Sequence, residues 1–90
     1  MIKAIVTVIG KDRVGIIAEV CAMLAERKVN VLDISQTVMQ AYFTMIMLVD
    51  VSESPLPFAE MAEQLAGKGR ETGLDIRMQR EEIFNAMHRI

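Results

Sequence analysis

The chain has 90 residues, of which 52% are apolar, and its ten Lys and Arg against twelve Asp and Glu give a formal net charge of −2. A chain of this size makes one domain with enough apolar residues for a core, and it offers no basic run to neutralise phosphates, so we expect no direct binding to nucleic acid. With Cys21 as its single cysteine, no secretory signal within Met1 to Ile9 and apolar runs, such as residues 45–49, far short of the roughly 20 residues that a membrane helix needs, it is expected to be a cytoplasmic protein without a disulfide or a membrane helix.

The chain opens with a predicted β-strand, Ile2 to Ile9, which is rich in β-branched residues and ends at Gly10. The spacing of apolar residues then predicts a helix over Val14 to Lys28, with Asp12 as its N-cap. The apolar side of this helix is formed by Ile16, Ile17, Val20, Cys21 and Leu24. On that side we expect Cys21 to be a small buried residue rather than a reactive thiol.

Two further strands are predicted next, Val29 to Gln40 and Ala41 to Val51, joined by a hairpin turn near Gln40 and Ala41. The first alternates between apolar and polar residues, which is typical of a strand with one wet face. Its apolar positions are Leu32, Ile34 and Val38. The second is nearly all apolar and is expected to be an inner strand covered on both sides.

A second helix is predicted after the break at Ser52 to Pro57, since apolar residues recur there at i, i+3, i+4 and i+7. These residues are Phe58, Met61, Ala62 and Leu65. Gly67 and Gly69 are expected to weaken the end of this helix, and Gly73 fits its C-cap.

The last two predicted elements are a strand and a short helix. Leu74 to Arg80 alternates, with Leu74, Ile76 and Met78 facing inward. The terminal helix runs from Glu81 to about His88. Its apolar stripe is formed by Ile83, Phe84, Met87 and Ile90.

Together these elements give the order strand, helix, strand, strand, helix, strand and terminal helix, in which residues 1–40 and 41–80 repeat one strand-helix-strand unit. This is the ferredoxin-like βαββαβ pattern of the α+β class. Right-handed crossovers place both main helices on one face of a four-stranded antiparallel sheet, with the first and third strands at its centre. The other face of the sheet then needs a cover, which the terminal helix, another subunit or both would supply.

The corner between the first strand and the first helix, Gly10 to Ile16, is the candidate functional site. Free N–H groups at a helix start attract carboxylates or phosphates, glycines let a ligand come close, and Asp12 can cap the helix or hold the amine of a ligand. A purely structural reading stays open, in which Asp12 only caps the helix and Gly15 only permits close packing. Lys11 and Arg13 are expected to be solvated side chains.

In this order of elements, Asp12-Arg13-Val14-Gly15-Ile16 resembles the Asp-Arg-Pro-Gly-Leu/Ile corner motif of the ACT domain, a ferredoxin-like module that binds amino acids and related metabolites in regulated enzymes and transcription regulators. Val14 replaces the frequent proline, which leaves helix initiation to Asp12. Asn30-Val31 looks like the second contact point of the family. Residues 33–38, 42–45 and 82–84 are similar to small, stand-alone, uncharacterised ACT proteins of prokaryotes, and the chain also resembles the ACT halves of the glycine cleavage system repressor.

The resemblance covers essentially the whole chain and implies one ACT domain over residues 1–90, with 1–80 as the βαββαβ core and 81–90 as the C-terminal helix. It implies a homodimeric regulatory sensor, in which two subunits pair side by side and a small-molecule effector, first of all an amino acid, sits at their junction. Backbone N–H groups near Val14 to Ile16 would take the effector carboxylate, and Asp12 or Asn30 would hold its amine. The ligand-binding residues carried over in this way are Gly10, Lys11, Asp12, Arg13, Val14, Gly15, Ile16, Asn30 and Val31.

The alternative function is a dimerisation or protein–protein interaction module that binds no ligand and serves an unknown protein partner. In that case Asn30 only satisfies a turn, and the polar residues of the second strand form an exposed face or a dimer edge rather than the lining of a pocket. Those polar residues are Ser35, Gln36 and Thr37.

An enzyme or a nucleic-acid binder on the same fold has little support in the sequence. His88 is the only histidine and has no other His or Cys at ligand spacing, so we expect no metal, no cofactor and no catalytic activity. The motifs of acylphosphatases and copper chaperones are absent. Tyr42 and Phe43 are adjacent and point to opposite faces, unlike the stacked aromatics of RNA-recognition domains.

Overall fold

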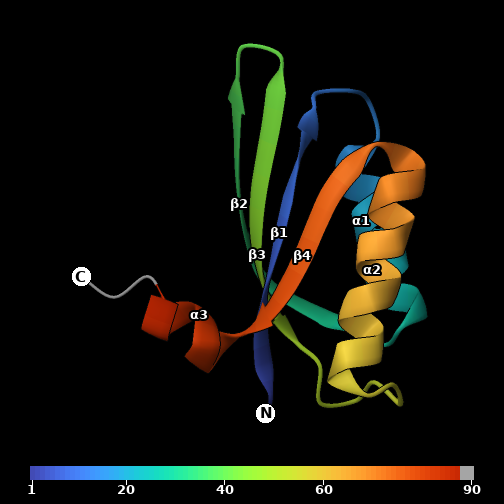
Figure 1. Cartoon of the computed structure of the whole chain (residues 1–90), viewed down its shortest axis with the longest axis vertical. Helices are drawn as coiled ribbons and strands as arrows, with labels where there is room; N and C mark the ends of the chain where they lie inside the picture. The colour runs from blue at the N-terminus through green and yellow to red at the C-terminus, as the bar shows by residue number, and fades with distance from the viewer. Residues whose placement is uncertain (88–90) are drawn as a thin grey trace.

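The computed structural model describes residues 1–87, which form a four-stranded sheet with two main helices on one face and a short terminal helix on the other side (Figure 1). In chain order the elements are β1 (Lys3–Lys11), α1 (Ile16–Glu26), β2 (Asn30–Met39), β3 (Tyr42–Asp50), α2 (Phe58–Thr72), β4 (Leu74–Arg80) and α3 (Glu81–Met87). This is the predicted βαββαβ order with its additional helix.

The strands lie in the order β2-β3-β1-β4, and every neighbouring pair is antiparallel. The first and third strands are therefore central, as predicted. Val6 shows the register, because it pairs with Met47 of β3 on one side and with Met78 of β4 on the other. The predicted hairpin is also confirmed: Gln40 has a φ of 56° and stands between β2 and β3.

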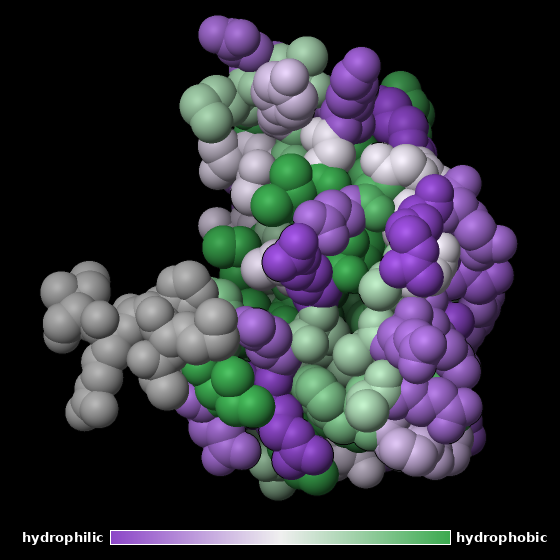
Figure 2. Space-filling view, in the orientation of Figure 1, coloured by the Kyte–Doolittle hydropathy of each residue, from purple (hydrophilic) through white to green (hydrophobic). Residues whose placement is uncertain are grey.

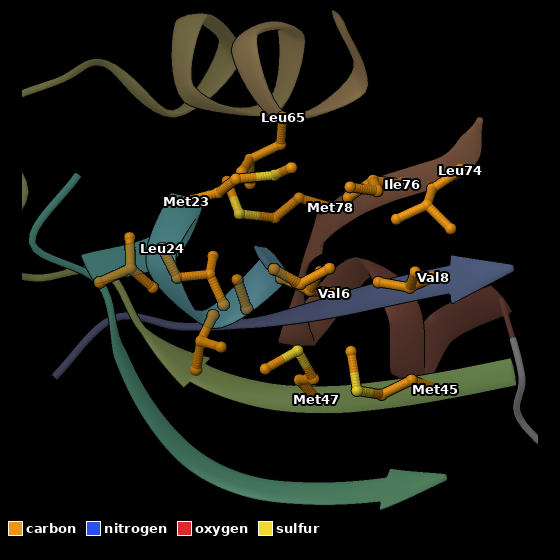
Figure 3. Packing of buried hydrophobic residues seen from close by; sticks show 14 of the residues in the cluster. Val6, Val8, Met23, Leu24, Met45, Met47, Leu65, Leu74, Ile76 and Met78 are labelled. Atoms are coloured by element: carbon orange, nitrogen blue, oxygen red, sulfur yellow. The ribbon is translucent and has the colours of Figure 1, made fainter. Parts of the chain in front are cut away.

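The core lies between the sheet and the two main helices, where alternate residues of the strands meet the apolar sides of α1 and α2 (Figure 3). It consists of Ala4, Val6, Val8, Ile16, Val20, Met23, Leu24, Val29, Phe43, Met45, Met47, Val49, Val51, Met61, Leu65, Leu74, Ile76 and Met78. The three inward residues of β4 are those predicted. Five methionines, whose unbranched side chains fit irregular gaps, do much of the filling.

The start of α1 differs from the prediction, because Asp12 is not its N-cap. Gly15 occupies that position with a φ of 90°, α1 begins at Ile16, and no side chain caps the helix. The backbone N–H of Asp12 instead donates a hydrogen bond of 2.8 Å to the carbonyl of Ala41. This bond holds Asp12 beside the β2–β3 hairpin, too early in the chain to reach the first turn of the helix.

The buried side of α1 is also rotated from the predicted one. Ile17 is 37% exposed and Cys21 is half-buried, whereas Met23, which the sequence analysis left out, is buried. At the other end of α1 the buried Arg27 donates hydrogen bonds to the side chain of Gln64 (2.9 Å) and to the carbonyl of Met23 (2.8 Å). These bonds join the end of α1 to α2.

Two predictions about the hairpin strands are wrong. β2 is the edge strand, and all its residues but Val31 are exposed, so it has no buried face in the isolated chain. A β-bulge between Val31 and Asp33 leaves Leu32 out of the pairing. β3 is covered only on the helix side: its alternate residues are buried there, whereas Ile46 on the other side is 42% exposed.

The second helix runs through Gly67 and Gly69 to Thr72, further than the predicted weakening suggested, and Gly73 caps it with a φ of 77°, as predicted. Gly69 is buried where α2 crosses β4. A Cβ atom on Gly69 would lie 2.6 Å from the carbonyl oxygen of Leu74 and 3.0 Å from Cγ1 of Ile76. Glycine at this position therefore allows the backbones of helix and strand to approach.

The terminal helix α3 begins directly after β4 and contacts β1 and β4. Of its predicted apolar stripe, Phe84 is half-buried and Ile83 is 48% exposed. His88 and Ile90 lie outside the described residues. No helix within residues 1–87 is long and apolar enough to cross a membrane.

Candidate functional site

The corner between β1 and α1 borders an open hollow of about 260 Å³. The loop and the first turn of α1 form one wall, and the helix-facing side of the β2–β3 hairpin forms the other. The lining residues are Asp12, Arg13, Gly15, Ile16, Ile17, Ala18, Gln36, Val38 and Phe43. The structure thus brings the predicted loop together with residues more than twenty positions further along the chain.

The start of α1 supplies the anion-attracting part of the hollow. The N–H groups of the first helical residues, Ile16 to Ala18, have no acceptor within the helix, and no side chain caps them. The positive end of the helix dipole lies at the same place. A carboxylate in the hollow would therefore find hydrogen-bond donors that are already oriented.

Gly15 and Val14 shape the corner. The φ of 90° at Gly15 is strained for any residue with a side chain, so glycine is needed for the chain to turn into the helix here. Val14 is 99% exposed at the tip of the corner and Ile16 is only 2% exposed. Ile16, directly after the glycine, thus anchors the corner in the hydrophobic core.

Gly10 and Lys11 are the last two residues of β1 and do not line the hollow. A Cβ atom on Gly10 would lie 2.7 Å from Cδ2 of Leu74, so this glycine makes room for the start of β4. Lys11 pairs with Tyr42 and lies on the outer face of the sheet, the face turned away from the hollow.

Asp12 is a lining residue of the hollow and does not cap the helix, so its carboxylate is a candidate partner for the amine of a ligand. Gln36 of β2 lies on the side of the hollow, because this residue pairs with the inward-facing Met45. Ser35 and Thr37 lie on the other side of β2, so only one of the three polar candidates on this strand lines the hollow.

Arg13 is exposed, as predicted, but it also makes specific contacts. Its guanidinium forms an ion pair with Glu19 in the first turn of α1 and donates a hydrogen bond of 3.2 Å to the carbonyl of Thr72 at the end of α2. Arg13 therefore ties the corner to the far end of the other helix.

We expect Arg13→Ala to lower the free energy of unfolding by no more than about 1 kcal/mol, because the ion pair is more than a third exposed. Amide hydrogen exchange at residues 12–15 should nevertheless become faster once the tie to Thr72 is lost. Lys11→Ala, which removes a positive charge on the other face, is the control and should leave this exchange unchanged. Equal exchange in the two variants would contradict the proposed tie.

Asn30 and Val31 lie at the opposite end of the sheet from the hollow. Asn30 pairs with Asp50, whereas Phe43 in the hollow stands near the other end of β3. Near Asn30, hydrogen bonds from the Ser52 hydroxyl and backbone N–H lower the pKa of the Asp50 carboxyl. Within one chain the two predicted contact points are therefore not brought together.

The lining residues that sequence reasoning missed are Ile17, Ala18, Val38 and Phe43. A signal for two of them existed, because a turn at Gln40 and Ala41 pairs Val38 with Phe43. The pairing of Phe43 with Gly10 of β1, which puts them beside the corner, is a tertiary contact with no counterpart in local sequence.

No group of three His, Cys, Asp or Glu side chains in residues 1–87 is arranged to hold a metal ion. The hollow combines the N–H donors at the start of α1 with Asp12 and with the apolar residues Val38 and Phe43.

Comparison with known proteins gives consistent matches over the whole sheet. A family model described as ACT domain matches residues 3–79. The UPF0237 protein of Clostridium acetobutylicum is 58% identical over 88 residues, which span 98% of this chain and 99% of that protein.

Solved structures agree with the sequence matches. An ACT domain protein from Streptococcus pneumoniae superposes with a TM-score of 0.82 at 40% identity, covering 97% of this chain and 98% of that one. A protein described as a putative glycine cleavage system transcriptional repressor superposes with a TM-score of 0.71 at 27% identity, covering 88% of this chain and 45% of that one.

Proposed function

The chain belongs to the ACT domain family, and from that premise we propose that it is a regulatory module that binds an amino acid and works as a homodimeric sensor. The observation that carries the proposal is the hollow beside the uncapped start of α1, which combines N–H donors with the carboxylate of Asp12. A free amino acid carries the complementary pair of charges on adjacent groups.

In the proposed complex the effector carboxylate accepts hydrogen bonds from the N–H groups of Ile16 to Ala18. Its ammonium group lies against the carboxylate of Asp12, and its side chain lies toward Val38 and Phe43. Arg13, held by Glu19 and Thr72, keeps the corner in place rather than binding the ligand itself. This arrangement satisfies both charges of a zwitterion.

The exposed edge strand β2 supports the homodimer. Unpaired backbone groups along a strand edge are a template for another strand, and the ten-residue β2 presents such an edge. In an antiparallel pair of β2 strands about a twofold axis the two ends of the strand exchange places, so Asn30 of a second copy lies beside Val38 or Met39. The second contact point would then reach the hollow from the other subunit.

A ligand bound at such a junction stabilises the pair, and by linkage the pair binds the ligand more tightly. Regulation then follows from a change in association with itself or with a partner protein. The structural likeness to a putative glycine cleavage system transcriptional repressor supports a role in the control of amino-acid metabolism. In this role the chain acts as one domain in the cytoplasm, without a cofactor and without catalysis of its own.

Thermal unfolding in the presence of each of the twenty amino acids tests the ligand. At a concentration a hundred times the Kd, binding to the native state alone adds about 2.7 kcal/mol, which in a domain of this size raises the Tm by roughly 10 °C or more. Because Asp12 does not cap α1, Asp12→Ala should leave the unliganded Tm nearly unchanged and remove most of this rise.

Glu63→Ala, which removes an acidic residue from the exposed side of α2, is the matched control and should keep the full rise. If none of the twenty amino acids raises the Tm, or if Asp12→Ala responds like Glu63→Ala, the site is wrong. A dimer by size-exclusion chromatography without any such rise would favour the dimerisation module that binds no ligand.

A further inference from the structure

The face of the sheet opposite α1 and α2, here called the outer face, has an uncharged centre. Its middle is formed by alternate residues of the two central strands, β1 and β3. These are Ile5, Thr7, Ile9, Thr44, Ile46 and Leu48. Ile9 and Ile46 are 48% and 42% exposed, and Figure 2 shows apolar surface (green) along the side of the molecule from which α3 projects.

The terminal helix covers only part of this face. Phe84 lines a hollow of about 390 Å³ together with Ile5, Ile9 and the surrounding residues of β4, while Ile83 stays 48% exposed. Figure 1 shows α3 projecting away from the sheet on the side opposite to α1 and α2. A helix of seven residues is far shorter than the roughly 12–15 residues at which isolated helices become even marginally stable, so it depends on packing against other parts of the protein.

We propose that the outer face, together with α3, is an interface between two copies of this chain, packed sheet against sheet. The proposal adds a second interface to the β2 edge and does not depend on the ligand. It accounts at once for the uncharged centre of the sheet and for a short helix with an exposed apolar residue.

The distribution of charge favours a second copy of this chain, related by a twofold axis parallel to the strands. Such an axis places β1 over β3 of the second copy and β4 over its β2. On the outer face Asp33 is the charged residue of β2, while β4 carries Arg77 and Asp75, whose side chains pair with each other at 3.2 Å. Arg77 lies one row of this face away from Asp33 in the register of the sheet, and Asp75 lies in the row of the uncharged Thr37. Arg77 thus approaches Asp33 of the second copy, and the uncharged central strands face each other.

The size of the face is close to what a specific interface needs. Four strands about 4.8 Å apart, each with about seven residues at a rise of about 3.3 Å, make a face of roughly 450 Å² in each copy. Two such faces make roughly 900 Å² of flat area, to which the relief of their side chains and the apolar side of α3 add; the lower limit of specific interfaces is about 1,200 Å² of total buried surface.

Light scattering after size-exclusion chromatography tests the proposal through Ile46→Lys, which puts a charge at the middle of the outer face. Ile46 is 42% exposed, so the isolated fold tolerates lysine there. The expected result is a particle of half the mass of the wild type: a dimer from a tetramer if the β2 edges also pair, or a monomer from a dimer if they do not. The halving of the mass tests the outer face. The remaining mass, of a dimer or of a monomer, shows whether the β2 edges also pair.

Thr44→Lys, on the same face and also on β3, is the second variant and should give the same halving. Ala22→Lys, which adds the same charge to the exposed side of α1, is the control and should keep the mass of the wild type. Circular dichroism confirms that each variant is folded. If folded Ile46→Lys and Thr44→Lys keep the mass of the wild type, the outer face is not an interface between copies.

Discussion

Replacing Gly69 by alanine is expected to lower the free energy of unfolding by about 3 kcal/mol, although alanine is the better helix former. The added Cβ would lie 2.6 Å from the backbone carbonyl oxygen of Leu74, an atom that moves only if the strand moves. α2 and β4 must then separate along their contact. The free energy of unfolding of a 90-residue domain is only about 5–13 kcal/mol, so this loss is large.

Urea unfolding at a fixed protein concentration measures the effect, with the m-value showing that the transition still reports the same surface. Gly67→Ala on the same helix is the matched control. There the nearest atom to a new Cβ is the flexible end of Arg70, 3.7 Å away, so the substitution should stabilise by up to about 1 kcal/mol. Changes of the same sign in the two variants would contradict the close approach at Gly69.

Met47→Ala is expected to cost about 3–4 kcal/mol, because Met47 is fully buried on the central strand β3 and a cavity would remain between sheet and helices. Met47→Leu keeps most of the volume and should cost less than about 1.5 kcal/mol. The same urea titration compares the two variants. A loss in Met47→Leu as large as in Met47→Ala would mean that the shape of methionine, and not its volume, is what the core requires.

The order of elements follows from the sequence because each has a clear local signal. β4 is the clearest case, since Gly73 ends the preceding helix and strict alternation then leaves a single choice of inward residues. The buried side of α1 is harder to predict, because apolar residues occupy more than one side of this helix. Packing against the sheet buries Met23 and exposes Ile17, and neither periodicity nor residue type distinguishes them.

Of the candidate site, the corner from Asp12 to Ile16 was predictable and its surroundings only in part. The cap was misassigned because Asp12 has the chemistry of an N-cap, yet a backbone bond to Ala41 holds it elsewhere. The hairpin wall depends on how β3 pairs with β1, which is a long-range contact. Asn30 lies at the far end of the sheet, so only an assembly of two chains would bring it to the corner.

The bond between the N–H of Asp12 and the carbonyl of Ala41 uses main-chain atoms alone. Mutation at either position therefore leaves the anchor intact, provided that proline does not enter at residue 12. Natural variation can then change which chemical group is presented at residue 12 without shifting the place from which it is presented. In the proposed function, a change of residue 12 would then alter the preferred metabolite while the architecture stays constant.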